Sequence, residues 1–512
     1  MAFTELKAKA KAFWAQKDFN YSALPEDTTT QGVVNQPRTT SWTNRHRLAV
    51  KFTGAVIILA IIGVIGLGIA RTNKEHSCDY VNSGFQCETA ISHAWGQYSP
   101  YYAVPSDISN EIPARCEVTF AQVLSRHGAR DPTLNKSKAY AALFERIHDN
   151  VTEYGEGYGF IKKYKYTLGA DQLTVFGEQQ LVNSGIQFYK RYEKLARTVS
   201  PFVRTAGQKR VVDSAYNWTQ GFHEARLKDK KAEFPDAYPY EPLVIPEGEG
   251  FNNTLSPDTC TSFKEGDDDG NDAQAVWTGI FAPPITDRVN EALPGANLSN
   301  SDIIHLMDLC PFETVANTDG HLSLFCDLFT KEEWESYDYY QSLGKWYGYT
   351  SNPMGPTQGV GFVNELIARL TGQPVVDSTS TNTTLDSSRK TFPLDSVLYA
   401  DFSHDNDMAN VFGALGLYNA TEPLSNTTKA SPRQSNGYSA SWTVPFAARM
   451  YVEKMLCEGS DEEYVRVLIN NRVIPLQNCD ADAYGRCTLG KFVESLSFAR
   501  RGGHWDQCFT AS

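Results

Sequence analysis

Three short segments contain the residue types that phosphoryl transfer needs. In the first, Arg126-His127-Gly128-Ala129-Arg130, two guanidinium groups flank one imidazole. Guanidinium groups can hold phosphate oxygens in pairs while a histidine ring nitrogen attacks the phosphorus atom. Gly128 allows the backbone to turn tightly beside such a ligand. The same letters also arise by chance on protein surfaces, so their context decides between the two interpretations.

The other two segments supply the parts that the first one lacks. Arg204 ends a short apolar run just before a predicted helix, and His404-Asp405 ends another. A phosphohistidine mechanism needs a nucleophile, a clamp for the equatorial oxygens and an acid that protonates the departing alkoxide. Alone, a His-Asp pair more often caps a helix, but the combination favours a site. We predict His127 as the nucleophile, Asp405 as the acid, and a clamp made of Arg126, Arg130, Arg204 and His404.

These segments follow predicted strands. Glu117–Ser125 is a nearly unbroken apolar run, typical of a strand buried on both faces of a sheet. Phe202–Thr205 and Val397–Phe402 are shorter runs, each followed by a loop and a helical pattern, and Gln172–Arg197 has one apolar helical face. This βα order predicts an α/β sheet whose ligand lies at the carboxyl ends of the strands. Val465–Leu476 is predicted to form a hairpin with an Asn-Asn turn.

Composition excludes several classes of protein. The chain has 512 residues, of which 41% are hydrophobic and 21% charged, so it can form a sizeable core and is not a mainly disordered protein. Its net charge of -13 argues against a nucleic-acid binder. We find no Walker loop and no CxxC or HExxH motif. The acidic segment 264–272 is predicted to be a solvated loop, because it lacks the glycine that a calcium loop requires.

Residues 52–70 are predicted to be a transmembrane signal anchor. These nineteen residues carry no charge, and as a helix they would span roughly 28 Å, close to the thickness of a bilayer's hydrocarbon core. They follow 51 polar residues, whereas a cleaved signal peptide starts near the N-terminus. Cations are concentrated before the span, which predicts a cytoplasmic N-terminus and a type II membrane protein. The alternative is a buried core helix.

The two sides of this anchor differ in charge and in cysteine content. Residues 1–51, predicted to be a disordered cytoplasmic tail, hold 8 basic and 4 acidic side chains, which leaves 39 and 56 beyond the anchor. Residues 71–512 contain all 10 cysteines, as expected of a lumenal or extracellular domain. That part also carries glycosylation sequons, which predict a glycoprotein; they begin at Asn135, Asn150, Asn217, Asn252, Asn297, Asn382, Asn419 and Asn426.

The sequence beyond the anchor resembles the histidine acid phosphatases, and in particular the fungal 3-phytases. The stretches that carry the resemblance include CEVTFAQVLSRHGAR, SLGADQLTVFGEQQLVNSGI, GPTQGVGFVNELIARLTG, LYADFSHDN, WTVPFAARMYVEKM and GRCTLGKFVESLSFARRGG. It covers roughly residues 77–510 but not the tail and anchor, since those phytases look like cleaved, secreted proteins.

The resemblance implies a six-stranded, mainly parallel α/β domain beside a smaller all-α domain, drawn mainly from about residues 135–200 and 255–350. It implies the roles predicted above for the six site residues, with no metal or organic cofactor and with activity at acidic pH. It also implies an outer set of substrate-binding residues, namely Gln97, Tyr98, Lys136 and Lys345. The implied disulfides are Cys78–Cys87, Cys116–Cys457, Cys260–Cys508, Cys310–Cys326 and Cys479–Cys487; spacing alone could not have selected them.

Three positions depart from the family pattern. Asp131 replaces an aromatic residue, and Ala139 and Gly344 stand where lysines would be expected. A carboxylate beside a phosphate pocket repels a polyanion. From the resemblance we predict an acid phosphatase that releases phosphate from phytate. Because of the three departures, a broad-specificity acid phosphatase is the alternative. A non-catalytic, membrane-tethered glycoprotein is the competing class. Such a protein would be expected to have lost some of the catalytic residues, whereas this sequence has all of them.

Overall fold

The computed structural model describes residues 88–509, except 234–239, 249, 266–267 and 319. The described residues all belong to one compact unit. The predicted tail (1–51), the predicted anchor (52–70) and the Cys78–Cys87 pair lie outside the described residues. Within the described ranges, no helix is both long enough and apolar enough to cross a bilayer.

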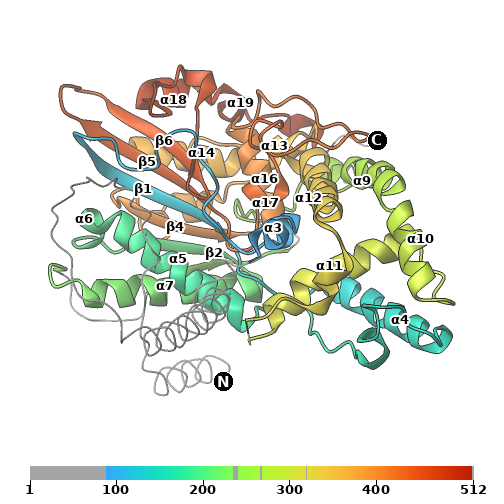
Figure 1. The fold of residues 1–512 in the computed structure, drawn as a ribbon. Coiled ribbons are helices and arrows are strands. Elements are labelled where there is room, and N and C mark those ends of the chain that lie inside the picture. Colours follow the sequence, from blue (N-terminus) through green and yellow to red (C-terminus); the bar gives the residue numbers. More distant parts are fainter. Residues whose placement is uncertain (1–87, 234–239, 249, 266–267, 319, 510–512) are drawn as a thin grey trace, which may run out of the picture. The chain divides into compact units, whose positions relative to one another are not determined.

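A mixed sheet of eight strands forms the centre of this unit (Figure 1). The strand order is β3-β2-β4-β1-β5-β6-β7, and β8 pairs with β6 at the side. The pairs β2–β3, β2–β4 and β1–β4 are parallel, whereas β1–β5, β5–β6, β6–β7 and β6–β8 are antiparallel. The bounds are β1 Cys116–Arg126, β2 Phe202–Ala206, β3 Leu243–Ile245, β4 Leu398–Ser403, β5 Arg449–Cys457, β6 Glu463–Ile469, β7 Arg472–Ile474 and β8 Arg486–Thr488.

The expectation of six mainly parallel strands is therefore wrong in number and in direction. The three parallel pairs are made by strands that are separated by long, helix-containing connections. The C-terminal strands are joined by short turns, and a short turn can join only antiparallel neighbours. One of these turns is Asn470-Asn471 between β6 and β7, where both residues have positive φ, so the predicted hairpin is confirmed.

The central strand β1 is buried along most of its length, as its apolar run predicts. It pairs in parallel with β4, in a register that places Arg126 beside Ser403. Its polar Gln122 is accommodated because the side-chain Nε2 donates a hydrogen bond to Asp401 Oδ2 at 3.0 Å. The ends of β1 and β4 thus lie next to each other, and the next residue on each strand is a histidine.

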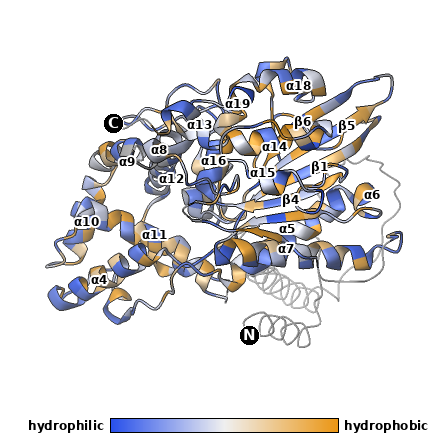
Figure 2. Cartoon of the chain, turned by 180° about the vertical axis from the view of Figure 1, so that it is seen from behind, coloured by the Kyte–Doolittle hydropathy of each residue, from blue (hydrophilic) through white to orange (hydrophobic). Residues whose placement is uncertain are grey.

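Helices cover both faces of the sheet (Figure 1). In that view α5 and α7 lie below the sheet, and α14 lies behind its strands, as the view from the back in Figure 2 also shows. The longer helices are α4 Leu134–Asn150, α5 Val175–Arg191, α7 Lys209–Lys228, α9 Asp268–Phe281, α10 Pro283–Ala292, α11 Asn300–Ala316, α12 Lys331–Lys345, α14 Val360–Thr371 and α16 Asp405–Ala414. Shorter ones are α3 Thr89–Ser92, α6 Glu193–Ala196, α8 Thr261–Glu265, α13 Gly355–Gln358, α15 Thr383–Asp386, α17 Ala440–Thr443, α18 Leu489–Ser495 and α19 Ser497–Arg500.

Two glycines allow α5 and α7 to pack closely. A Cβ added to Gly185 of α5 would lie 2.0 Å from the Trp218 carbonyl oxygen, and one added to Gly221 of α7 would lie 1.9 Å from that of Val182. Both helices have buried apolar residues along their length, and Figure 2 shows hydrophobic segments alternating with hydrophilic ones on both ribbons. Although α5 falls within residues 135–200, which were expected in the helical domain, it packs against α7, and its Phe188 ring lies 6.0 Å from the Tyr451 ring of β5, centre to centre.

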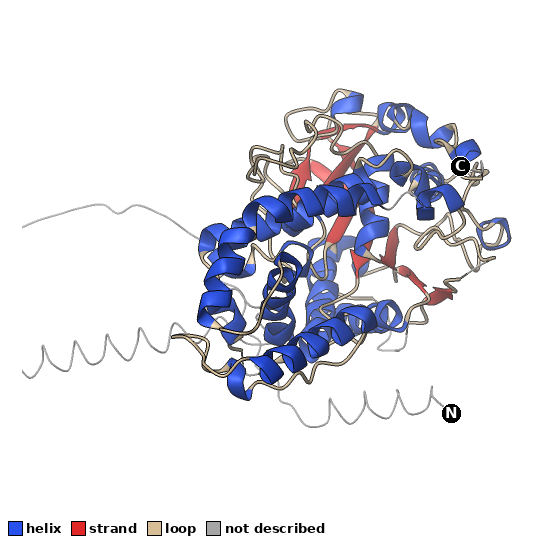
Figure 3. Ribbon diagram, turned by 90° about the vertical axis from the view of Figure 1, so that its right-hand side faces the viewer, coloured by secondary structure: helices blue, strands red, loops and turns tan. Residues whose placement is uncertain are grey.

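The remaining long helices gather beside the sheet. Helices α4, α10 and α11 lie off its edge, and α9 and α12 continue this helical region (Figure 1). Figure 3 shows from the side that helices surround the strands. The acidic segment 264–272, which was expected to be a loop, contains the start of α9. Acidic residues are favourable at that end of a helix because the macrodipole is positive there.

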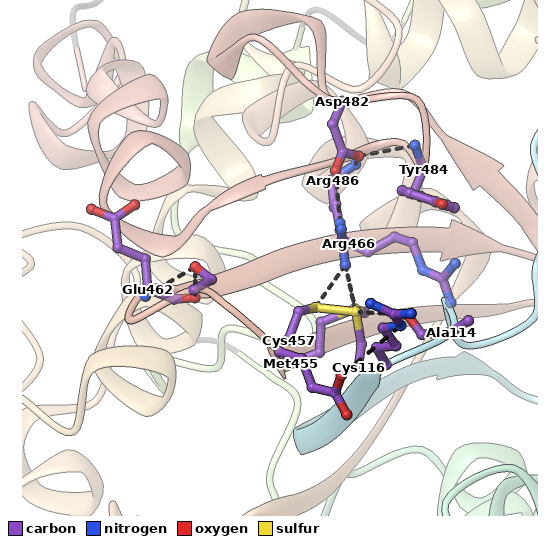
Figure 4. The surroundings of a disulfide bond; sticks show 12 residues. Ala114, Cys116, Met455, Cys457, Glu462, Arg466, Asp482, Tyr484 and Arg486 are labelled. Atoms are coloured by element: carbon purple, nitrogen blue, oxygen red, sulfur yellow. Dashed lines mark hydrogen bonds and ion pairs between the residues drawn. A yellow bond between two sulfur atoms is a disulfide. The ribbon is translucent and has the colours of Figure 1, made fainter.

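Four disulfides are present among the described residues: Cys116–Cys457, Cys260–Cys508, Cys310–Cys326 and Cys479–Cys487. These four expected pairs are confirmed. Cys116–Cys457 joins the start of β1 to the end of β5, and Arg486 Nη1 lies 2.8 Å from each of its sulfur atoms (Figure 4). Asp482 holds this guanidinium in place through an ion pair of 2.8 Å.

Candidate active site

A pocket of about 480 Å³ opens at the carboxyl ends of β1 and β4. The elements that meet there include the loops after both strands, the start of α7, and residues of α9 and α12. The lining residues include Gln97, Tyr98, Arg130, Gln208, Arg210, Glu247, Ser256, Asn271, Gln274, Gln341, Lys345, His404, Asp405, Asn406 and Asp407.

His127 is the first residue after β1 and is fully buried. Its Nδ1 lies 2.8 Å from the carbonyl oxygen of Gly128. A carbonyl can only accept, so Nδ1 carries the proton and Nε2 keeps its lone pair. Nε2 has no hydrogen-bond partner among the described residues. Burial, and then the charges of Arg126, Arg130 and nearby cations, hold the pKa of His127 well below its usual value, which keeps Nε2 available as a nucleophile.

Arg126 is positioned by the backbone around it. Its Nη1 donates to the carbonyl oxygens of Gln97 and Val444, the latter at 2.7 Å, and its guanidinium lies 4.7 Å from the centre of the Phe446 ring. Burial lowers the pKa of Arg126 to about 10, so it remains charged at acidic and neutral pH. Arg130 lines the pocket and is anchored by a 2.8 Å hydrogen bond to the carbonyl oxygen of Asp131.

Arg204 does not line the pocket, contrary to the expectation that it would hold phosphate. It lies inside β2, and its side chain is buried in a cluster with Asp401, at 2.9 Å, and Glu365, at 2.7 Å. Because Arg204 lies within β2 and not after it, its side chain extends from a face of the sheet and does not lie at the end of the strand. Arg210 in the first turn of α7 takes the expected place: it lines the pocket and helps to lower the pKa of His127.

Asp405 is the first residue of α16, where the helix N-terminus favours a carboxylate. Its Oδ1 lies 3.4 Å from Arg126 Nη2, and its Oδ2 lies 2.6 Å from Lys345 Nζ. Burial alone would raise the pKa of Asp405, but Arg126, Lys345 and His127 hold it well below its usual value. Asp405 is therefore ionised in the free pocket.

His404 caps the N-terminus of α16 and faces His127 edge-on, with 5.8 Å between the ring centres. Its Nε2 lies 3.1 Å from Oε1 of Glu247, which also accepts a 2.9 Å hydrogen bond from the Gln208 backbone N–H. Burial opposes the charge on Glu247, but the contact with His404 lowers its pKa overall. Glu247 was not predicted from the sequence, since it follows a strand of only three residues.

Only some of the predicted outer residues line the pocket. Gln97, Tyr98 and Lys345 line the pocket, whereas Lys136 is not among its lining residues. Lys136 Nζ instead forms a 2.6 Å ion pair with Asp308, whose side chain is fully buried. Of the described residues, no group of three or more His, Cys, Asp or Glu side chains is arranged to hold a metal ion.

The three departures from the family pattern have different surroundings. The Asp131 carboxylate accepts a hydrogen bond from the Gly169 backbone and is not a lining residue, so its expected repulsion of substrate is not seen in the geometry. A Cβ added to Gly344 would lie 2.6 Å from Gln274 Nε2, so a side chain there would displace Gln274. Ala139 is half-buried on α4.

Comparison with known proteins gives consistent matches. The family described as histidine phosphatase superfamily (branch 2) matches residues 117–470. Phytase A of Aspergillus oryzae is 55% identical over 441 residues, which cover 85% of this chain and 94% of that protein. Phytase A of Emericella nidulans is 53% identical over 442 residues, covering 85% and 95%.

Solved structures agree on the fold. The crystal structure of the phytase from D. castellii superposes with a TM-score of 0.65 at 22% identity, and the match covers 82% of this chain and 88% of that one. Together with the two histidines at adjacent strand ends and the arginines around them, these matches place the protein: the chain belongs to the histidine phosphatase superfamily, branch 2.

Proposed function

We propose that this protein hydrolyses phosphomonoesters at acidic pH through a phosphohistidine on His127, and that phytate (inositol hexakisphosphate) is one of its substrates. The observation that carries the proposal is the state of His127, whose Nε2 is unprotonated, without a partner among the described residues, and surrounded by cationic side chains. The relatives named phytase A support phytate as a substrate.

In the proposed reaction His127 Nε2 attacks the phosphorus atom and the ester P–O bond breaks. Arg126, Arg130, Arg210 and His404 hold the equatorial oxygens, whose negative charge grows most strongly in the transition state. Asp405 gives a proton to the departing alkoxide, which leaves as an alcohol. Water then attacks the phosphohistidine, releases inorganic phosphate and restores His127 with its free Nε2.

Asp405 must gain a proton before it can act as an acid. In the free pocket Arg126 and Lys345 oppose this, because both favour the carboxylate. A bound phosphate ester places negative charge against Arg126 and so raises the affinity of Asp405 for a proton. Substrate binding and proton uptake are thus coupled in the proposed mechanism, which favours activity at acidic pH.

A second candidate is a broad-specificity acid phosphatase with little preference for phytate. It is favoured by the mixed lining of the pocket, where Glu247 and Asp407 lie among the cations and Lys345 is the only lysine in the described lining. One assay separates the two candidates: phosphate release from phytate and from several simple monoesters, measured from about pH 3 to pH 7, a range that brackets ordinary Asp and His titrations. Equal kcat/KM values for phytate and the monoesters would favour the broad enzyme.

We also propose that residues 1–51 are cytoplasmic, that 52–70 anchor the protein as a type II membrane protein, and that 71–512 form a lumenal or extracellular glycoprotein domain with a helical subdomain. The asparagines of the sequons support this, because none of the eight is buried. Membrane fractionation before and after removal of residues 1–70, together with glycosidase digestion, tests the topology. Full-length protein that stays soluble without detergent would contradict the anchor.

A non-catalytic glycoprotein is disfavoured because it would not need the arrangement around His127.

A further inference from the structure

Asp407 is a titratable group in the pocket that the proposed mechanism does not use. It lies in the first turn of α16, two residues after Asp405, and lines the same pocket. Its carboxylate accepts a hydrogen bond from the side chain of Ser256, which is also a lining residue. The side chain is therefore held at the place where substrate would bind, without being needed for the chemical step.

The groups around Asp407 shift its pKa in both directions. Burial raises its pKa, the imidazole of His404 lowers it, and the carboxylates of Glu247 and Asp405 raise it again. The net result is a pKa of about 7. Asp407 is consequently neutral at acidic pH and becomes a carboxylate as the pH rises through neutrality.

We propose that Asp407 is a specificity-determining residue that admits polyanionic ligands in its neutral form and repels them in its charged form. The inference rests on the proposed function, since it assigns the pocket to phosphate esters. A neutral carboxyl group can donate a hydrogen bond to a phosphate oxygen, whereas a carboxylate repels it. Because Coulomb repulsion grows with ligand charge, the charged form discriminates against inositol polyphosphates more strongly than against simple monoesters.

The test uses a ligand whose own charge does not change. Phytate titrates near neutrality, but the sulfate esters of myo-inositol hexakissulfate stay ionised throughout this range and are not phosphomonoesters. Calorimetric binding to the folded protein at pH 5.5 and pH 8 should show the affinity falling by about ten-fold more in the wild type than in Asp407→Asn. Inorganic sulfate, with less charge, should show a smaller difference between the two proteins.

Two further variants sharpen the result. Ser256→Ala removes a hydrogen bond that stabilises the Asp407 carboxylate, so the loss of affinity should move to higher pH; this variant also tests the inference if Asp407→Asn fails to fold. Asp272→Asn removes the same charge from an exposed position on α9 and should behave like the wild type. An Asp407→Asn protein with the wild-type pH dependence would overturn the proposal, as would a Ser256→Ala protein with an unshifted one. Phytate turnover by the wild type is measured separately, so failure of the proposed function is recognised independently.

Discussion

Arg204 and Asp401 face each other on adjacent parallel strands, and the Arg204 guanidinium donates two hydrogen bonds to the Asp401 carboxylate, at 2.9 and 3.2 Å. Both side chains are buried. Arg369 of α14 adds a third donor to Asp401 at 2.7 Å, and Glu365 of the same helix accepts from Arg204. This cluster fastens α14 to β2 and β4, so Arg204 supports the fold beneath the pocket.

Arg204→Ala should therefore mainly lower stability, whereas Arg210→Ala should mainly lower activity. Removing Arg204 leaves Arg369 to balance two buried carboxylates, Asp401 and Glu365, and should lower the free energy of unfolding by about 3–5 kcal/mol. Removing Arg210 breaks only a 3.5 Å ion pair with half-exposed Asp171, but should lower kcat/KM by about 10²–10³-fold. Denaturant unfolding and aryl phosphate kinetics on both variants check this; equal stability losses would contradict it.

His127→Ala should abolish phosphate release because no other nucleophile takes part in the proposed reaction. The protein should still fold, since the backbone hydrogen bonds of residue 127 do not depend on its side chain. Trapping of phosphoprotein after acid quench should likewise succeed for the wild type and fail for the variant. Substantial turnover by the variant would refute the assigned nucleophile.

Lys345→Met should move the pH profile of kcat. Lys345 favours the Asp405 carboxylate from 2.6 Å, so its removal raises the pKa of Asp405 and keeps the acid protonated to higher pH. The alkaline limb of kcat should shift upward by about one pH unit. Lys331→Met provides the control on the same helix, because its ion pair with Glu335 is exposed. An unmoved limb in Lys345→Met would count against coupling between Lys345 and the acid.

Cys116–Cys457 should be the first of the four described disulfides to be reduced by dithiothreitol. Both of its cysteines are half-buried, whereas those of the other three bonds are buried. The Arg486 guanidinium beside both sulfurs stabilises a departing thiolate, which speeds exchange. Timed alkylation and mass spectrometry should find Cys116 and Cys457 labelled first.

The matching variant for this prediction is Arg486→Gln, which should slow the labelling. Arg115→Gln, at an exposed position next to Cys116, serves as the control and should leave the rate close to that of the wild type. Reduction of a buried disulfide before Cys116–Cys457 would show that exposure does not set the order.

The sequence predicted those parts of the fold that depend on local pattern. The apolar run before His127 is β1, and the run before His404 is β4. Asp405, which was expected in the loop after that run, is instead the first residue of α16. The count of six strands was taken from the family resemblance, and the sequence could not correct it because β3 and β8 have three residues each, too few for a periodic pattern. The four-residue helices give equally little pattern.

The candidate site could be predicted only for residues whose position along the chain also determines where the side chain points. Arg204 and Arg210 lie six residues apart around the same glycine turn, and composition cannot tell which side chain reaches the pocket. Lys136 was expected in the pocket, but its partner Asp308 lies far away in the sequence. Glu247 enters the site through a tertiary contact with His404 that no sequence motif predicts. Asp407 lies in the site because it belongs to the first turn of α16.

The register between β1 and β4 separates two kinds of change that evolution can make. Because Arg126 pairs with Ser403, the positions of the proposed nucleophile and the proposed acid are set by a backbone ladder that side-chain substitutions barely disturb. Gln97, Gln274 and Gln341 reach the same pocket from segments outside the sheet. A lineage can therefore replace those contacts one at a time and acquire new substrates while its reaction chemistry is inherited intact.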